Sequence, residues 1–318
     1  MYKIKLNLPI IRNINIDIQD KQLFIFTQRQ LKNYITDIST NNDDVNFVNI
    51  QTNINKKFND VILGREVQFY NNVLQFTINS RVQTINYQYD FNNYLKIDIN
   101  FKKKLFYYIK ALIKSNYAIK HILFYQTVLY PVFSLYALSD NYFLVHGSLL
   151  KLEDKYIVLT GLDGVGKSSL SNELVLNGAK ILADNFVLFN GNNFLGLNMP
   201  IRLDLQNPTN ENILYKDNSL KEILYSYKED NKINGNEVYF LNISNSLKIQ
   251  ELDNNLSKYN WNFINNGAGE ITDANRFCLP FLYQNLLSKK QIFDNTIKYF
   301  SFSIPKGKIK EAIKEIIS

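Results

Sequence analysis

The first hundred residues alternate short apolar and polar runs. Residues 74–78 carry an apolar side chain at every second position, which is the period of a half-buried strand. Two asparagines at 71–72 separate this run from residues 67–70 and predict a tight hairpin turn. The short apolar run 23–26 indicates another strand. We therefore expect residues 1–100 to form a smaller, β-rich N-terminal domain.

The pattern becomes helical after residue 100. Apolar residues recur at helical spacing over 105–113, and a second helical stretch covers 119–138. We expect the segment 101–140 to be a helical lead-in to a second domain at 101–318. Its uncharged part, 121–138, is at the short end of a membrane span and contains polar residues and a proline. We therefore expect a buried helix pair there and no membrane span.

Strands and a helix alternate from residue 143 onward. The runs 143–150 and 156–160 predict two strands, and the second of them is apolar throughout. A glycine-rich loop follows, and then a helix over 167–176 with a glycine just beyond its end. Residues 180–183 predict a further strand that ends at Asp184.

The remaining pattern indicates a mixed sheet. An Asn-Gly pair in the middle of 186–197 is the strongest short-range signal of a hairpin, which favours mixed over all-parallel strands. Beyond residue 200 the expected elements are helices near 220–227, 247–256, 275–287 and 308–317, and strands at 238–243 and 297–302.

The segment 161–168, GLDGVGKS, matches the phosphate-binding pattern G-x-x-x-x-G-K-[ST]. Its glycines allow a tight turn whose N–H groups point at an anion, and the helix that follows adds its positive end. Lys167 is expected to reach the β- and γ-phosphates of a nucleotide, and the Ser168 hydroxyl to bind magnesium. The sequence therefore predicts an α/β fold around a nucleotide site. The residues expected to contact the nucleotide are Gly161, Asp163, Gly164, Val165, Gly166, Lys167, Ser168 and Ser169.

Composition narrows the partners only slightly. The excess of 36 basic over 29 acidic residues gives a net charge of +7, which suits a nucleic acid, an anionic membrane or a phosphorylated ligand equally. Hydrophobic residues make up 46% of the chain, which excludes a wholly disordered protein. One cysteine and two histidines exclude a disulfide framework and a Cys- or His-rich metal centre. The first residues lack the features of a signal peptide, so we expect a cytoplasmic protein.

Two further residues stand at defined distances from the loop. Asp184 follows Lys167 by 17 residues, and His146 precedes Lys167 by 21 residues near the start of a strand. The order of the histidine, the loop and the aspartate along the chain resembles that of the HPr kinase/phosphorylase family. The matching strings are VHGSLL, GLDGVGKSSL and ILADNFVLF. The chain is more similar still to stand-alone relatives such as lasso-peptide precursor kinases, which share a Pro-x-(Leu/Ile)-Arg-Leu segment that here contains Arg202. The resemblance covers about residues 119–205.

This resemblance implies a fold and a set of roles. The fold would be a mixed-sheet P-loop kinase domain of the HPr kinase/phosphoenolpyruvate carboxykinase type, with ATP and Mg²⁺ at the junction of loop and helix. Asp184 would accept the proton of the attacking hydroxyl and join Ser168 as a metal ligand. His146 would orient Asp184 or a water, and Arg202 would contact the transferring phosphoryl group. Taken alone, His146 also fits a core histidine and Arg202 a surface ion pair.

Two positions depart from the family pattern. Asn185 stands where the family usually has a second aspartate, and Ser169 where it often has a carboxylate. An amide cannot hold a proton or a negative charge, so these changes weaken the expectation of a second Mg²⁺ and of a reverse, phosphorylase reaction.

The sequence thus favours an ATP-dependent kinase acting on a hydroxyl, either serine of a peptide or small protein or a small hydroxylated molecule. The alternative is a catalytically reduced nucleotide-binding regulatory protein. A basic nucleic-acid-dependent ATPase is disfavoured, because we find no basic run interleaved with aromatics at an exposed loop and no separate Walker-B strand. Members of the family often form multimers, so a homo-oligomer is compatible with the resemblance.

Overall fold

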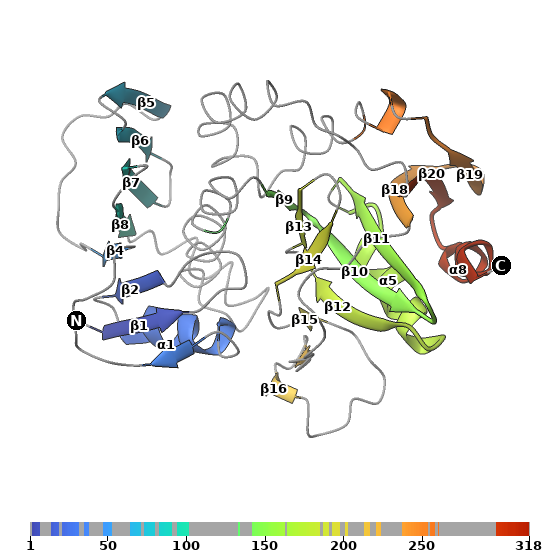
Figure 1. Cartoon of the computed structure of the whole chain (residues 1–318), viewed down its shortest axis with the longest axis horizontal. Helices are drawn as coiled ribbons and strands as arrows, with labels where there is room; N and C mark the ends of the chain where they lie inside the picture. Colours follow the sequence, from blue (N-terminus) through green and yellow to red (C-terminus); the bar gives the residue numbers. More distant parts are fainter. Residues whose placement is uncertain are drawn as a thin grey trace. The chain divides into compact units, whose positions relative to one another are not determined.

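Two compact units, Met1–Tyr136 and Ala137–Ser318, compose the chain in the computed structural model (Figure 1). The expected boundary near residue 100 stays a prediction, because residues 102–132 lie outside the described part. The described residues are 2–6, 14–18, 21–31, 35–37, 47–52, 64–70, 73–79, 83–90, 94–101, 133, 142–162, 164–184, 187–190, 193–197, 201–202, 213–216, 221–223, 237–253, 255–257, 260 and 297–317.

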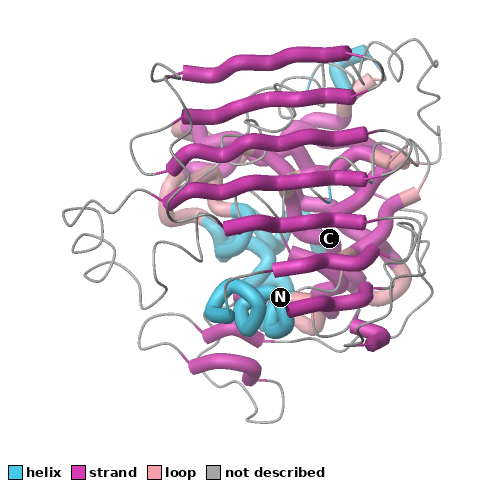
Figure 2. The backbone as a smooth tube through the Cα atoms, turned by 90° about the vertical axis from the view of Figure 1, so that its left-hand side faces the viewer, coloured by secondary structure: helices cyan, strands magenta, loops and turns pink. Residues whose placement is uncertain are grey.

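The N-terminal unit contains an eight-stranded sheet in the order β3-β1-β2-β4-β8-β7-β6-β5. Its strands are β1 (Tyr2–Leu6), β2 (Ile14–Ile18), β3 (Ile35–Asp37), β4 (Phe47–Thr52), β5 (Gly64–Tyr70), β6 (Val73–Asn79), β7 (Gln83–Asp90) and β8 (Tyr94–Phe101). The pairs β2–β4 and β4–β8 are parallel, and the others are antiparallel. Figure 2 shows these strands as a ladder. The expected hairpin is confirmed, because β5 and β6 pair with Tyr70 opposite Val73.

The strand expected at 23–26 is instead part of a helix, α1 (Lys21–Gln30). Leu23, Phe26 and Thr27 are buried at helical spacing, whereas Ile25 between them is exposed. A strand would place alternate residues on the same face, so this burial pattern requires a helix. A short apolar run fits either element, and packing against β1 and β2 decides it.

The C-terminal unit is mixed α/β, as expected. Its six-stranded sheet has the order β12-β10-β11-β18-β20-β19. β11, β18 and β20 are parallel to one another, and the other pairs are antiparallel. The strands are β10 (Gly147–Leu152), β11 (Lys155–Gly161), β12 (Lys180–Asp184), β18 (Glu237–Ser244), β19 (Lys248–Glu251) and β20 (Lys298–Pro305).

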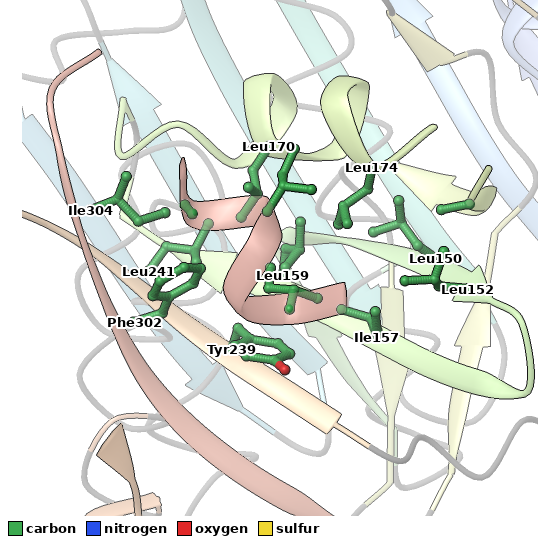
Figure 3. Close-up of a cluster of buried hydrophobic side chains, with 14 of the residues drawn as sticks. Leu150, Leu152, Ile157, Leu159, Leu170, Leu174, Tyr239, Leu241, Phe302 and Ile304 are labelled. Atoms are coloured by element: carbon green, nitrogen blue, oxygen red, sulfur yellow. The ribbon is translucent and has the colours of Figure 1, made fainter. Parts of the chain in front are cut away.

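Each face of this sheet is covered. Side chains alternate along the strands, so that Leu159 packs against helices α5 (Lys167–Leu176) and α8 (Ile309–Ile317) on one face (Figure 3). The neighbouring Val158 packs on the opposite face, in a cluster with residues of a three-stranded sheet. That smaller sheet consists of β9 (Phe143–Val145), β13 (Val187–Phe189) and β14 (Phe194–Gly196). A third sheet of this unit consists of β15 (Ile201–Arg202), β16 (Ile213–Lys216) and β17 (Lys221–Ile223).

Two helix predictions in this unit are wrong. The segment 247–256 contains β19, whose pairing with β20 places it at the edge of the sheet, and the segment 220–227 contains β17. Ile249 packs against the helix-covered core while its neighbours Lys248 and Gln250 are exposed, which is the alternation of an edge strand. The expected helices at 105–113 and 275–287 lie outside the described residues, as does all of 119–138 except Phe133.

A buried tyrosine, Tyr239, lies near the edge of the sheet where β11 and β18 begin. The Tyr239 hydroxyl donates a hydrogen bond of 2.9 Å to Glu237, and Lys155 lies 3.8 Å from the same carboxylate. Burial and the adjacent carboxylate of Glu237 raise the pKa of Tyr239, so its hydroxyl stays protonated. These groups stabilise the strand ends and lie opposite the edge that carries the glycine-rich loop 161–168, which we call the phosphate loop after its sequence pattern.

Candidate functional site

The sequence-predicted site elements meet at one edge of the six-stranded sheet. β11 and β12 end at this edge, and β10, which runs between them in the opposite direction, begins there. The register sets Gly147 opposite Thr160 and Ser148 opposite Asp184. The phosphate loop, Asp184 and His146 therefore lie around the same three strand ends, although 38 residues separate His146 from Asp184 along the chain.

The phosphate loop leaves β11 at a position that only glycine fits. A Cβ atom on Gly161 would lie 2.7 Å from the carbonyl oxygen of Leu241 on the adjacent strand β18. At the other end of the loop, Gly166 caps α5 with φ of 97°, in the left-handed region that glycine tolerates best. The two glycines thus allow the chain to leave the sheet and enter the helix within six residues.

We expect Gly161→Ala to lower the free energy of unfolding by about 1–3 kcal/mol, the usual cost of overpacking, because the paired backbone of β18 must shift. Gly178→Ala is the matched control, since Gly178 also has a positive φ but has nothing within 4 Å of an added Cβ. Urea unfolding of both variants measures the difference. An equal loss in the two would show that the contact with Leu241 costs nothing.

Positive charge gathers where the loop meets α5. Lys167 is buried at the start of the helix, and its Nζ donates hydrogen bonds of 2.9 Å to the carbonyl oxygens of Gly161 and Leu162. Gly166 supplies no side-chain cap, and the first turn of α5 contains no acidic residue. The first backbone N–H groups of a helix attract anions, and here they adjoin an ammonium group. Ser168 and Ser169 in this turn are exposed, and Val165 packs partly against the core.

A buried carboxylate lies on the same face of the sheet as α5. Asp184 is 5% exposed, and its Oδ1 accepts a hydrogen bond of 2.7 Å from the Ser148 hydroxyl. Leu150 and Leu152 follow Ser148 at two-residue steps and pack in the cluster that α5 covers. Because side chains two apart share a face, Ser148 and its partner Asp184 lie on the α5 side. A carboxylate there can act as a base or bind a cation.

His146 lies at the step between two sheets. The expected single strand 143–150 is divided at this residue into β9 and β10, which belong to different sheets. The His146 side chain is buried, and its carbonyl oxygen accepts a hydrogen bond of 3.1 Å from the Thr160 hydroxyl. This bond ties the start of β10 to the end of β11, immediately before the phosphate loop. A role of the imidazole in orienting Asp184 stays a prediction.

Arg202 lies on β15, directly opposite Glu222 of β17 in the strand register, and its contact with a phosphoryl group stays a prediction. Asp163 and Asn185 lie outside the described residues. The sequence did not lead us to predict Ser148 as a site residue, although it belongs to the string His-Gly-Ser that we compared with the family. The available signal was a polar residue two positions before the apolar pair Leu150 and Leu152 on a buried strand face.

Among the described residues, no helix combines the length and apolarity needed to cross a bilayer. Comparisons of the chain with protein-family models and with curated proteins find no match.

Proposed function

We propose that the C-terminal unit is an ATP-dependent kinase of the HPr kinase-like P-loop type, which transfers the γ-phosphate of ATP to a hydroxyl group. The acceptor is serine of a peptide or small protein, or a small hydroxylated molecule. One observation carries the proposal: the buried carboxylate of Asp184 shares a sheet edge and a sheet face with the lysine-bearing phosphate loop. A phosphate site alone would suit many nucleotide-binding proteins, whereas transfer to a hydroxyl also benefits from a base beside the phosphate.

The residues at the loop fit Mg-ATP. Backbone N–H groups of the loop and the first turn of α5 would hold the phosphates, together with the ammonium group of Lys167. The oxygen donors of Ser168 and Asp184 suit Mg²⁺, which prefers hard oxygen ligands. Bound Mg²⁺ would supply neutralisation of the phosphate charge. The ammonium group of Lys167 already lies against the loop backbone, so only a short movement of the side chain would bring it to the β- and γ-phosphates.

The proposed reaction uses Asp184 as the base. The acceptor hydroxyl oxygen forms a bond to the γ-phosphorus while the bond from that phosphorus to the bridging oxygen of ADP breaks. The hydroxyl proton passes to the carboxylate of Asp184, and ADP leaves with the electron pair of the broken bond. Burial of Asp184 keeps bulk water from competing for the carboxylate. Lys167 offsets the charge that develops on the phosphate oxygens.

The test is ATP-dependent phosphorylation of a panel of serine peptides and free serine, with ADP release measured in parallel. We expect at least one acceptor to be phosphorylated and the product to be lost in Asp184→Asn. Binding of Mg-ATP with no transfer to any acceptor would contradict the kinase proposal.

A second candidate is a nucleotide-binding regulatory protein with reduced catalysis. Asn185, which replaces a family carboxylate, favours it. In that case the wild type should transfer phosphate to none of the acceptors, while Asn185→Asp should gain ATP hydrolysis. For a working kinase, the added charge beside Asp184 should leave transfer similar or lower, because the two carboxylates repel each other. Measuring ATP consumption by both proteins across the panel distinguishes the candidates.

A further inference from the structure

Ser148 is a buried hydroxyl in a position that packing alone would make apolar. Its side chain is 0% exposed and lies on the sheet face where Leu150 and Leu152 pack under α5. A buried hydroxyl without a hydrogen bond destabilises a folded protein, so an alanine would suit this face better than an unsatisfied serine. The hydrogen bond to Asp184 therefore accounts for a serine here.

The hydrogen bond joins adjacent strands. Ser148 and Asp184 are directly opposite in the register of β10 and β12, and 2.7 Å separates Ser148 Oγ from Asp184 Oδ1. Hydrogen bonds from a hydroxyl to a carboxylate are short and about twice as strong as those between neutral groups. Both groups are buried, which shields the bond from competition by water.

We propose that Ser148 is a positioning residue for the phosphoryl transfer, which fixes the orientation of the Asp184 carboxylate beside the phosphate loop. This inference rests on the proposed kinase function. The terminal torsion of an aspartate is broad, so the carboxylate can rotate unless a partner holds it. Ser148 holds Oδ1 from the neighbouring strand, and this fixes the plane in which Asp184 meets the acceptor hydroxyl. Ser148 itself need not touch the substrate.

The first experiment compares transfer kinetics of Ser148→Ala, Ser148→Thr and the wild type on the acceptor identified above. We expect Ser148→Ala to lower kcat by about 10- to 100-fold, the range expected when a catalytic group is displaced by up to about 1 Å. The KM for ATP should stay within about twofold, because the loop that binds the phosphates is unchanged. Ser148→Thr keeps the hydroxyl and should recover most of the lost rate.

The matched control is Ser171→Ala. Ser171 is also a fully buried serine of this unit, but its hydroxyl donates to the carbonyl oxygen of Lys167 within α5. Loss of such a helical hydroxyl should leave kcat unchanged, since the helix backbone retains its own hydrogen bonds. A kcat of Ser148→Ala equal to that of the wild type would overturn the inference. So would a Ser148→Thr protein that folds normally but is as slow as Ser148→Ala.

A second readout needs neither nucleotide nor activity. Urea unfolding of Ser148→Ala, Asp184→Ala and the double variant forms a double-mutant cycle. We expect the losses to be non-additive, because either single change removes the same hydrogen bond. This cycle measures the coupling between Ser148 and Asp184 even if the extra methyl of threonine prevents Ser148→Thr from folding. Additive losses would overturn the inference, whereas a wild type that transfers no phosphate would overturn the kinase proposal on which it rests.

Discussion

Replacing Lys167 with alanine is expected to weaken the binding of Mg-ATP by on the order of 100-fold, in line with the usual loss when one partner of a buried, hydrogen-bonded charge pair is removed. The ammonium group of Lys167 already lies at the loop, held by two backbone carbonyl oxygens 2.9 Å away. The substitution removes this charge from the site where the phosphates would bind. Calorimetric titration with Mg-ATP measures the loss directly.

The matched control is Lys298→Ala. Lys298 is exposed at the start of β20, at the opposite edge of the same sheet, so its removal changes the net charge by the same amount away from the loop. We expect its affinity for Mg-ATP to equal that of the wild type. Equal affinities of the wild type and Lys167→Ala, with both proteins folded, would contradict the assignment of the phosphate site.

Features with local signals were predictable from the sequence. The helix expected over 167–176 has these bounds in the structure, because a glycine stands at each end of its pattern. The hairpin of β13 and β14 was expected from the Asn-Gly pair in the sequence between two apolar runs. That hairpin also led us to expect a mixed sheet, and the six-stranded sheet is mixed, although β13 and β14 belong to the smaller sheet. Each of these predictions depends on residues within a few positions of one another.

Features decided by distant partners were not predictable. β19 is a strand because it pairs with β20, about fifty residues further along the chain, whereas its own pattern was interpreted as helical. The hydrogen bond between Ser148 and Asp184 joins residues 36 positions apart. It depends on β10 lying between β11 and β12, and no local pattern specifies that order. Sequence reasoning could therefore place Asp184 at the end of a strand but could not identify the residue that holds it.

The largest effect on phosphoryl transfer is expected from Asp184→Asn. The amide oxygen of asparagine can still accept the hydrogen bond from Ser148, so the pairing of β10 with β12 should persist. An amide cannot accept the proton of the attacking hydroxyl. Transfer should therefore fall by on the order of 100-fold or more, as is typical when a positioned general base is lost. Affinity for Mg-ATP should change only by a small factor, because Lys167 and the loop remain.

Single-turnover transfer and calorimetry separate these two effects, with Asp154→Asn as the matched control. Asp154 is exposed in the turn between β10 and β11, at the far end of the same strands, so its removal should change neither quantity. Transfer by Asp184→Asn at the wild-type rate would mean that the buried carboxylate only ties β12 to Ser148. A loss of Mg-ATP affinity as large as the loss of transfer would instead mean that Asp184 acts mainly as a ligand of the bound metal. Only a selective loss of transfer agrees with a carboxylate that takes the proton from the acceptor.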